Sequence, residues 1–68
     1  MMNRFNEKLK ELRKEQKLLQ KQVATDLGVT QVCIAKWETG NREPSLDMLI
    51  KISKYFGVTT DYLLGLED

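Results

Sequence analysis

One stretch of the sequence, residues 20–40 (QKQVATDLGVTQVCIAKWETG), constrains the fold more than any other. Apolar residues at helical spacing in its first half run into Gly28, a residue that readily adopts the left-handed conformation in which helices end. Two residues later stands Thr30, a good N-cap, and a second short helical pattern follows it. This spacing predicts two short helices joined by a tight turn, at about residues 20–27 and 31–39.

Three more helical patterns accompany this pair. Apolar residues at positions 5, 9 and 12 have the i, i+4, i+7 spacing of an amphipathic helix, which we place at about residues 3–17. Ser45 follows an exposed loop and is a suitable N-cap for a fourth helix, which ends at about residue 56. Either Thr59 or Thr60 caps a short fifth helix that reaches about residue 64.

The sequence therefore predicts an all-α fold, a single compact domain over residues 1–68 with five helices around one core. The side chains expected to face inward recur at helical spacing. On the second and third helices they are Val23, Ala24, Leu27, Ile34 and Trp37. On the fourth helix they are Leu46, Leu49, Ile50, Ser53 and Phe56.

Two short helices joined at a glycine turn are typical of a helix-turn-helix, here at about residues 20–39, whose second helix can lie in the major groove of DNA. On that helix Val32, Lys36 and Thr39 project nearly opposite the expected core residues, and Ala35 and Gln31 flank them. An amide, an apolar group and a cation suit adenine, a thymine methyl and guanine respectively. We expect Gln31, Val32 and Lys36 to contact base edges in this way, each good contact contributing about 1–3 kcal/mol of discrimination.

Polar residues at the helix ends are candidates for contacts with the DNA backbone. Gln20 begins the second helix, where free N–H groups and the positive end of the helix dipole favour a phosphate. Its side chain is also placed to brace Gln31. Thr30, Asn41 and Arg42 flank the third helix and are further candidates for phosphate contacts, which supply salt-sensitive affinity rather than sequence choice.

The order and spacing of these residues resemble the Cro/CI-type helix-turn-helix family (the lambda repressor-like or XRE family) over about residues 5–65. The matching residues are Arg13, Gln20, Val23, Ala24, residues 27–31, Ile34, residues 37–40, residues 42–44, Leu46, Gly57, Val58 and residues 61–65. The resemblance implies a lambda repressor-like, five-helix DNA-binding domain.

The resemblance also implies roles for individual residues. The family's base-reading positions fall on Gln31, Val32, Cys33 and Lys36. Its backbone-contacting positions fall on Gln20, Thr30, Thr39, Asn41 and Arg42. Arg13 and Glu38 match an ion pair that joins the first and third helices of the family.

Two residues depart from the family pattern. Leu19 stands where a Ser or Thr cap is common, so the second helix lacks a cap contribution of about 1 kcal/mol. Cys33 stands where a small hydroxyl residue is common. We expect Cys33 to pack as a small, half-buried residue rather than to sense redox state, because the chain has no second cysteine to resolve an oxidised thiol.

The fourth helix carries a second apolar series at i, i+4, i+7, which leaves two interpretations open. Some of this series must pack against the fifth helix. The rest could form a two-fold dimer seam, as the resemblance also implies, because the family commonly dimerises through its C-terminal region. The residues of this predicted seam are Met48, Ile52, Tyr55, Tyr62, Leu63 and Leu66.

Composition excludes several classes of function. One cysteine and no histidine leave no Cys/His zinc site and no histidine general base, so we expect no metal, no cofactor and no enzyme activity. No small-molecule ligand is indicated either. No apolar run approaches the roughly 20 residues that cross a bilayer, and the N-terminus lacks a secretory signal, so we expect a cytoplasmic protein, at the nucleoid when bound to DNA.

The charge of the chain is unevenly distributed. The net charge is only +1 and the pI about 7.8, below the pI of about 9 that marks many nucleic-acid-binding domains. Residues 1–21, however, hold seven basic and three acidic side chains, a net of +4. Those early cations are either the solvated face of the first helix or a source of long-range attraction to DNA.

The function that we predict is a sequence-specific regulator of transcription that binds double-stranded DNA. We expect a repressor that binds an inverted-repeat operator as a homodimer, with one third helix in each of two major grooves. The alternative is an antitoxin-like or other protein-interaction module with the same fold. The apolar surplus on the last two helices motivates this alternative.

Overall fold

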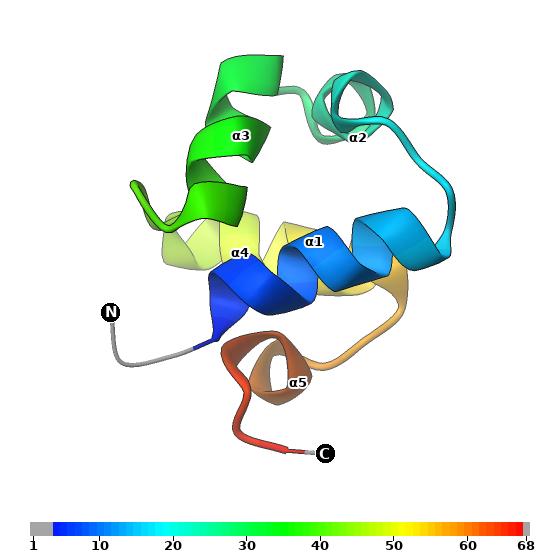
Figure 1. The fold of residues 1–68 in the computed structure, drawn as a ribbon. Coiled ribbons are helices and arrows are strands. Elements are labelled where there is room, and N and C mark those ends of the chain that lie inside the picture. The colour runs from blue at the N-terminus through cyan, green and yellow to red at the C-terminus, as the bar shows by residue number, and fades with distance from the viewer. Residues whose placement is uncertain (1–3, 68) are drawn as a thin grey trace.

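Five α-helices and no strands make up residues 4–67, the part of the chain that the computed structural model describes. The helices are α1 (Phe5–Glu15), α2 (Gln20–Leu27), α3 (Gln31–Thr39), α4 (Leu46–Phe56) and α5 (Thr60–Leu64). Figure 1 shows α1 crossing in front of α4, with α2 and α3 on one side of this pair and α5 on the other. The all-α prediction is confirmed, and α2 and α3 have the predicted bounds.

α1 ends earlier than predicted, at Glu15 rather than residue 17. The reason is Lys17, which takes a left-handed conformation with φ of 58°. The chain reverses there, and the N–H of Leu18 donates to the carbonyl of Arg13 at 3.0 Å. Glycine is the usual residue in this conformation at the end of a helix, so the local sequence does not indicate that α1 ends before Lys17.

The core draws side chains from all five helices. α1 contributes Phe5, Leu9 and Leu12; α2 contributes Val23, Ala24 and Leu27; α3 contributes Ile34 and Trp37; α4 contributes Leu49, Ile52 and Phe56; α5 contributes Leu63. The predicted inward-facing residues of α2 and α3 are all among them. Burying large apolar side chains contributes about 1.5–3 kcal/mol each, which is the main force that holds helices this short together.

The predicted core stripe of α4 was wrong at two positions. Leu46 is 79% exposed and Ile50 is 46% exposed, whereas Ile52 is fully buried. The observed stripe runs through residues 49, 52, 53 and 56, a spacing of i, i+3, i+4, i+7. Ile50 lies about 100° around the helix from Leu49 and so misses the core. Leu46 is the first residue of α4 and lies beyond the packed part of the stripe.

Two residues of the predicted dimer seam lie in the core instead. Ile52 and Leu63 are both 0% exposed, so neither presents a surface to a second copy. Tyr62 is half-buried, with the ammonium of Lys8 4.8 Å from the centre of its ring. The first of the two interpretations, packing of this series within the chain, therefore accounts for Ile52 and Leu63.

The predicted helix caps are formed. The side chains of Thr30, Ser45 and Thr59 each accept a hydrogen bond from the backbone N–H three residues further on. Leu19 has no acceptor with which to cap α2. Instead the side chain of Gln22 accepts the N–H of Leu19 at 2.7 Å, which is one half of a capping box.

The described ends of the chain lie side by side. The N–H of Arg4 donates to the carbonyl of Leu64 at 3.2 Å, which joins the start of α1 to the end of α5. None of the helices within residues 4–67 combines the length and the apolar character needed to span a bilayer.

Candidate nucleic-acid interface

One side of α3 packs in the core, and the other side is exposed to solvent. Ile34 is 0% exposed and Trp37 5% exposed, and both pack in the core. Gln31, Val32 and Lys36 lie on the exposed side, and Val32 itself is 61% exposed. We call these three residues the outer face of α3. An exposed valine between an amide and a cation is the mixture of groups that base edges can use.

A buried charge network fixes α3 to α1 and to the start of α2. Arg13 holds Glu38 through two hydrogen bonds, from Nε to Oε2 at 2.6 Å and from Nη2 to Oε1 at 3.0 Å. The Glu38 side chain is only 2% exposed. The predicted ion pair is therefore present, and the hydrogen bond to Glu38 raises the pKa of Arg13.

Two further groups complete this network. Arg13 Nη1 donates to the carbonyl of Leu18 at 2.9 Å, which anchors the loop between α1 and α2. Gln20 Nε2 donates to Glu38 Oε1 at 3.2 Å. The expectation that Gln20 braces Gln31 was therefore wrong, because its amide turns inward to the carboxylate. A buried carboxylate needs several donors to offset its lost hydration, and Glu38 draws them from two helices.

Cys33 and Thr30 are hydrogen-bonded to each other at the start of α3. The Thr30 hydroxyl accepts the backbone N–H of Cys33 at 3.2 Å and donates to Cys33 Sγ at 3.4 Å. That donated hydrogen bond is the largest cause lowering the pKa of Cys33, and the positive charges of Arg42 and Lys36 lower it further. Cys33 is half-buried, so it lies at the border between the two sides of α3.

The remaining predicted contact residues lie at the other end of α3. Thr39, Asn41 and Arg42 are exposed around Gly40, where the helix stops. The Thr39 hydroxyl donates back to the carbonyl of Lys36 at 3.2 Å. The predicted backbone-contacting residues therefore bracket the outer face, with Thr30 before it and Asn41 and Arg42 after it.

A hollow of about 440 Å³ lies beside this surface, between α3 and the loop before α4. Its wall includes Glu43, Pro44 and Ser45, from the loop before α4, for which the sequence predicts no contact with DNA. Cys33, Trp37, Arg42 and Met48 complete the lining. The sequence predicts only that this loop is exposed, and the fold places it beside α3.

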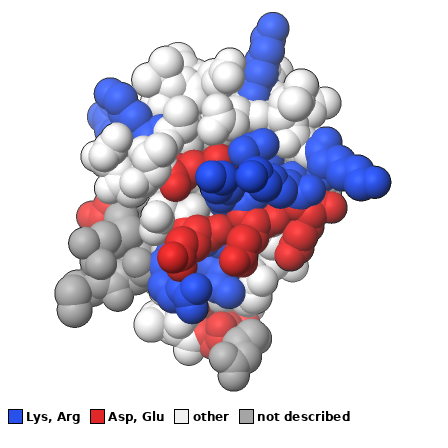
Figure 2. Space-filling model, viewed as in Figure 1, with Lys and Arg blue, Asp and Glu red and all other residues white. Residues whose placement is uncertain are grey.

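The early cations do not form one basic surface. In Figure 2 the face over α1 shows bands of basic and acidic side chains next to one another. Arg4 Nε lies 2.7 Å from a carboxylate oxygen of Glu7, and Lys8 Nζ lies 4.0 Å from Glu11. In the same view the part over α2 and α3 is mostly uncharged, with isolated basic side chains. The interpretation as a solvated helix face therefore fits α1 better.

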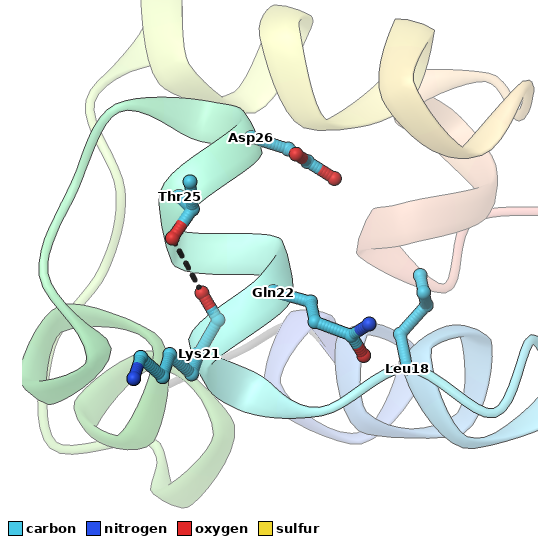
Figure 3. Close-up of a pocket in the computed structure, with 5 residues that line it drawn as sticks. All are labelled: Leu18, Lys21, Gln22, Thr25 and Asp26. Atoms are coloured by element: carbon cyan, nitrogen blue, oxygen red, sulfur yellow. Dashed lines mark hydrogen bonds between the residues drawn. The ribbon is translucent and has the colours of Figure 1, made fainter.

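α2 carries a second hollow, of about 310 Å³, on its outward side (Figure 3). It is lined by Leu18, Lys21, Gln22, Thr25 and Asp26. The Thr25 hydroxyl donates to the carbonyl of Lys21 at 3.0 Å, so it is satisfied within its own helix. The hollow is separate from the outer face of α3.

The known proteins that this chain resembles are helix-turn-helix regulators of transcription. The sequence matches the helix-turn-helix family over residues 9–63. The HTH-type transcriptional activator BcrR of Enterococcus faecalis is 47% identical over 64 residues, covering 94% of this chain and 31% of BcrR. An HTH-type regulator of Bacillus subtilis, YqaE, is 45% identical, covering 88% of this chain and 52% of its own length. The chain thus spans about a third to a half of these relatives.

Solved structures agree with the fold. A transcriptional regulator from Listeria innocua superposes with a TM-score of 0.90 at 31% identity, covering 100% of this chain and 64% of that one. The P22 c2 repressor, crystallised with a synthetic operator, superposes with a TM-score of 0.86 at 32% identity, covering 93% of this chain and 96% of that one. These relatives are transcriptional regulators rather than enzymes, in agreement with the prediction. Because the match runs from α1 into α5, the chain belongs to the helix-turn-helix family.

Proposed function

We propose that the chain binds double-stranded DNA in a sequence-specific manner and regulates transcription, with α3 lying in the major groove. The observation that carries this proposal is the exposed outer face of α3, Gln31, Val32 and Lys36, on a helix that the core and the Glu38 network hold in place. Rigid support matters because base contacts require side chains to be held in one position against the groove.

The base contacts follow from the chemistry of each side chain. Gln31 pairs with adenine through its amide, Lys36 donates to the acceptors of guanine, and Val32 packs on a thymine methyl. Cys33 is half-buried and bonded to Thr30, so it adds a small apolar edge beside Val32.

The backbone contacts come from Gln20, Thr30, Thr39, Asn41 and Arg42. Gln20 Nε2 carries two hydrogens, and its bond to Glu38 uses one of them, which leaves the other for a phosphate. Arg42 is the charged member of this group, so it contributes most to the salt dependence of binding. Asn41 and Arg42 are exposed beside the end of α3, where they contact the phosphates of the DNA strand that flanks the groove.

We propose further that two copies bind an inverted-repeat operator as a homodimer. One outer face offers only a few base contacts, and the net charge of +1 gives little general attraction to DNA, so a second copy is needed for tight binding. With Ile52 and Leu63 in the core, the residues left for a seam are Leu66, which is 70% exposed, and the half-buried Met48, Tyr55 and Tyr62.

Repression is the mode that needs the fewest assumptions, because a protein bound across a promoter excludes other proteins from it. This function places the protein in the cytoplasm, at the nucleoid when DNA-bound. A transcription assay on a template that carries the bound site ahead of a promoter gives the sign of regulation. We expect less transcript as the protein is added, and an increase would assign activation instead.

The DNA-binding proposal is tested by selecting duplexes from a random pool and footprinting the selected sequence. We expect enrichment of two half-sites related by inversion, with centres about 34 Å apart along the DNA. Recovery of random sequence after several rounds would contradict sequence-specific binding. A single half-site would retain the reading helix but contradict the homodimer.

A second candidate function, an antitoxin-like or other protein-interaction module, is favoured by one observation. Leu46 and Ile50 lie one turn apart on α4, 79% and 46% exposed. Two measurements separate the candidates: light scattering gives the mass of the protein, and titration with the selected duplex gives its DNA affinity. If Leu46→Ser with Ile50→Ser leaves both the mass of the protein and its DNA affinity unchanged, these residues serve neither a dimer nor DNA binding. A surface for another protein then remains their role.

A further inference from the structure

α2 lacks a cation of its own at its C-terminal end. Its last turn carries no basic side chain, whereas α1, α3 and α4 each have at least one there. Asp26, next to the last residue, adds a carboxylate at the negative end of the helix dipole. The end of α2 therefore gains stability from groups outside the helix.

α4 supplies these groups through two side chains one turn apart. Lys51 Nζ donates to the carbonyl of Leu27 at 2.8 Å, and the Tyr55 hydroxyl donates to Asp26 Oδ2 at 2.6 Å. We call these four residues the α2–α4 clamp. Figure 3 shows Asp26 at the end of α2 that lies nearest to the ribbon of α4. The bond to Asp26 raises the pKa of Tyr55 to about 12, so this hydroxyl remains a donor at neutral pH.

The clamp holds the two residues that lead into the turn before α3. Gly28 follows Leu27 with φ of 75°, and only Gly28, Val29 and Thr30 separate α2 from α3. A Cβ on Gly28 would lie 3.8 Å from Lys51 Nζ, so the lysine lies directly against the turn. With so short a connection, a shift of the Leu27 carbonyl moves the start of α3.

We propose that Lys51 and Tyr55 are positioning residues for DNA recognition, which hold the end of α2 and thereby the first turn of α3 in the arrangement that reads bases. The inference rests on the proposed DNA-binding function. Neither residue needs to touch DNA. When the clamp is broken, the two helices visit other arrangements, and the apparent affinity falls with the fraction of molecules in the competent one.

The experiment uses Lys51→Met and Tyr55→Phe, the second of which removes the hydroxyl but keeps the ring proposed for the dimer seam. The control is Lys54→Met, which removes an exposed lysine from the last turn of the same helix. The probes are the operator duplex from the selection and a random-sequence duplex of equal length. We expect Lys51→Met to weaken operator binding about tenfold, as when the competent fraction falls to about one tenth. Random-duplex binding and the dependence of operator affinity on salt stay unchanged. Lys51→Arg, which keeps a cationic donor, restores most of the affinity.

Each alternative has its own result. If Lys51 contacts a phosphate directly, Lys51→Met weakens both duplexes alike and reduces the slope of log K against log salt by about 0.9. If the clamp serves stability only, the melting temperature falls while operator affinity of the folded protein is unchanged. Either result overturns the proposal.

A measurement without DNA separates failure of the clamp from failure of the proposed function. We expect the backbone amide resonances of Gln31 and Val32 to shift in Lys51→Met and to stay in place in Lys54→Met. Unchanged resonances in both variants show that Lys51 does not position α3. If wild-type protein selects no DNA sequence while the resonances do shift, the proposed function has failed, and the proposed role in DNA recognition fails with it although the clamp is real.

Discussion

The two sides of α3 are built from different kinds of interaction. On the inner side Ile34 and Trp37 are buried in the core, and Glu38 receives hydrogen bonds from two other helices. On the outer face Gln31, Val32 and Lys36 are exposed. The difference means that the position of the helix and the chemistry that it presents are set by separate residues. The outer face can therefore change its base preference while the helix keeps its place.

The largest effect should come from the apolar part of the inner side. Ile34→Ala removes a fully buried side chain and leaves a cavity, so we expect the free energy of unfolding to fall by about 4 kcal/mol. Denaturant titration followed by Trp37 fluorescence measures it. The control is Val32→Ala on the outer face, where we expect a change within about 0.5 kcal/mol. Equal losses in the two variants would contradict the distinction between the two sides.

The charged part of the inner side comes next. Glu38→Ala leaves the guanidinium of Arg13 largely buried and without its carboxylate, and we expect a loss of about 3 kcal/mol in the free energy of unfolding. Adding Arg13→Met removes the unpaired charge and should recover part of that loss. Denaturant titration of both variants tests this. The interpretation fails if the second substitution makes the protein still less stable.

Substitutions on the outer face should act on DNA rather than on stability. We expect Lys36→Ala and Gln31→Ala each to reduce discrimination at particular operator positions by about 1–3 kcal/mol. Arg42→Ala should instead weaken binding to every duplex and flatten the salt dependence. Titrations of the operator and of single base-pair variants at two salt concentrations measure these effects. Unchanged affinity in all three variants would show that DNA is read elsewhere.

A smaller effect concerns the helix against which α3 packs. Leu19→Thr gives α2 the side-chain acceptor that it lacks and completes the capping box with Gln22. Because Leu19 is 66% exposed, little apolar burial is lost, and we expect a gain of about 1 kcal/mol in the free energy of unfolding. Leu19→Ala offers no acceptor and is the matched control. A gain of the same size in Leu19→Ala would show that the cap is not its source.

The smallest effect lies at the border between the two sides. The Thr30 hydrogen bond lowers the pKa of Cys33, so alkylation by iodoacetamide, which requires the thiolate, should reach half its maximal rate at a lower pH than for an unperturbed thiol. Thr30→Ala removes that bond and should move the midpoint to higher pH. Mass spectrometry of quenched samples gives the rates. An unchanged midpoint in Thr30→Ala contradicts the assigned interaction.

Local sequence patterns predicted the parts of the structure that depend on neighbouring residues. The bounds of α2 and α3 followed from Gly28, Thr30 and the apolar spacing between them. The N-caps were read from single side chains with hydrogen-bonding oxygens. The Arg13–Glu38 pair came from a family resemblance, since a separation of 25 residues leaves no local trace.

What could not be predicted depends on how separate helices meet. Ile50 and Ile52 are equally apolar, and only the packing of α4 decides which one is buried. The side chain of Gln20 could point toward Gln31 or toward the interior. It points inward because the buried carboxylate of Glu38 needs further hydrogen-bond donors. The contacts of Lys51 and Tyr55 with α2 span 24 and 29 residues and likewise required the fold.

The hydrogen bond between Arg4 and Leu64 has a practical consequence for engineering. It brings both described ends of the chain together at α5, which lies across the α1 and α4 pair from α3 (Figure 1). A module attached after residue 67 starts beside α5, away from the outer face of α3, whereas the first turn of α1 lies against the end of α3: a Cβ on Gly40 would lie 3.5 Å from Asn6 Nδ2. The C-terminal side is therefore the better attachment point for a fusion that must leave the outer face of α3 free to enter a groove.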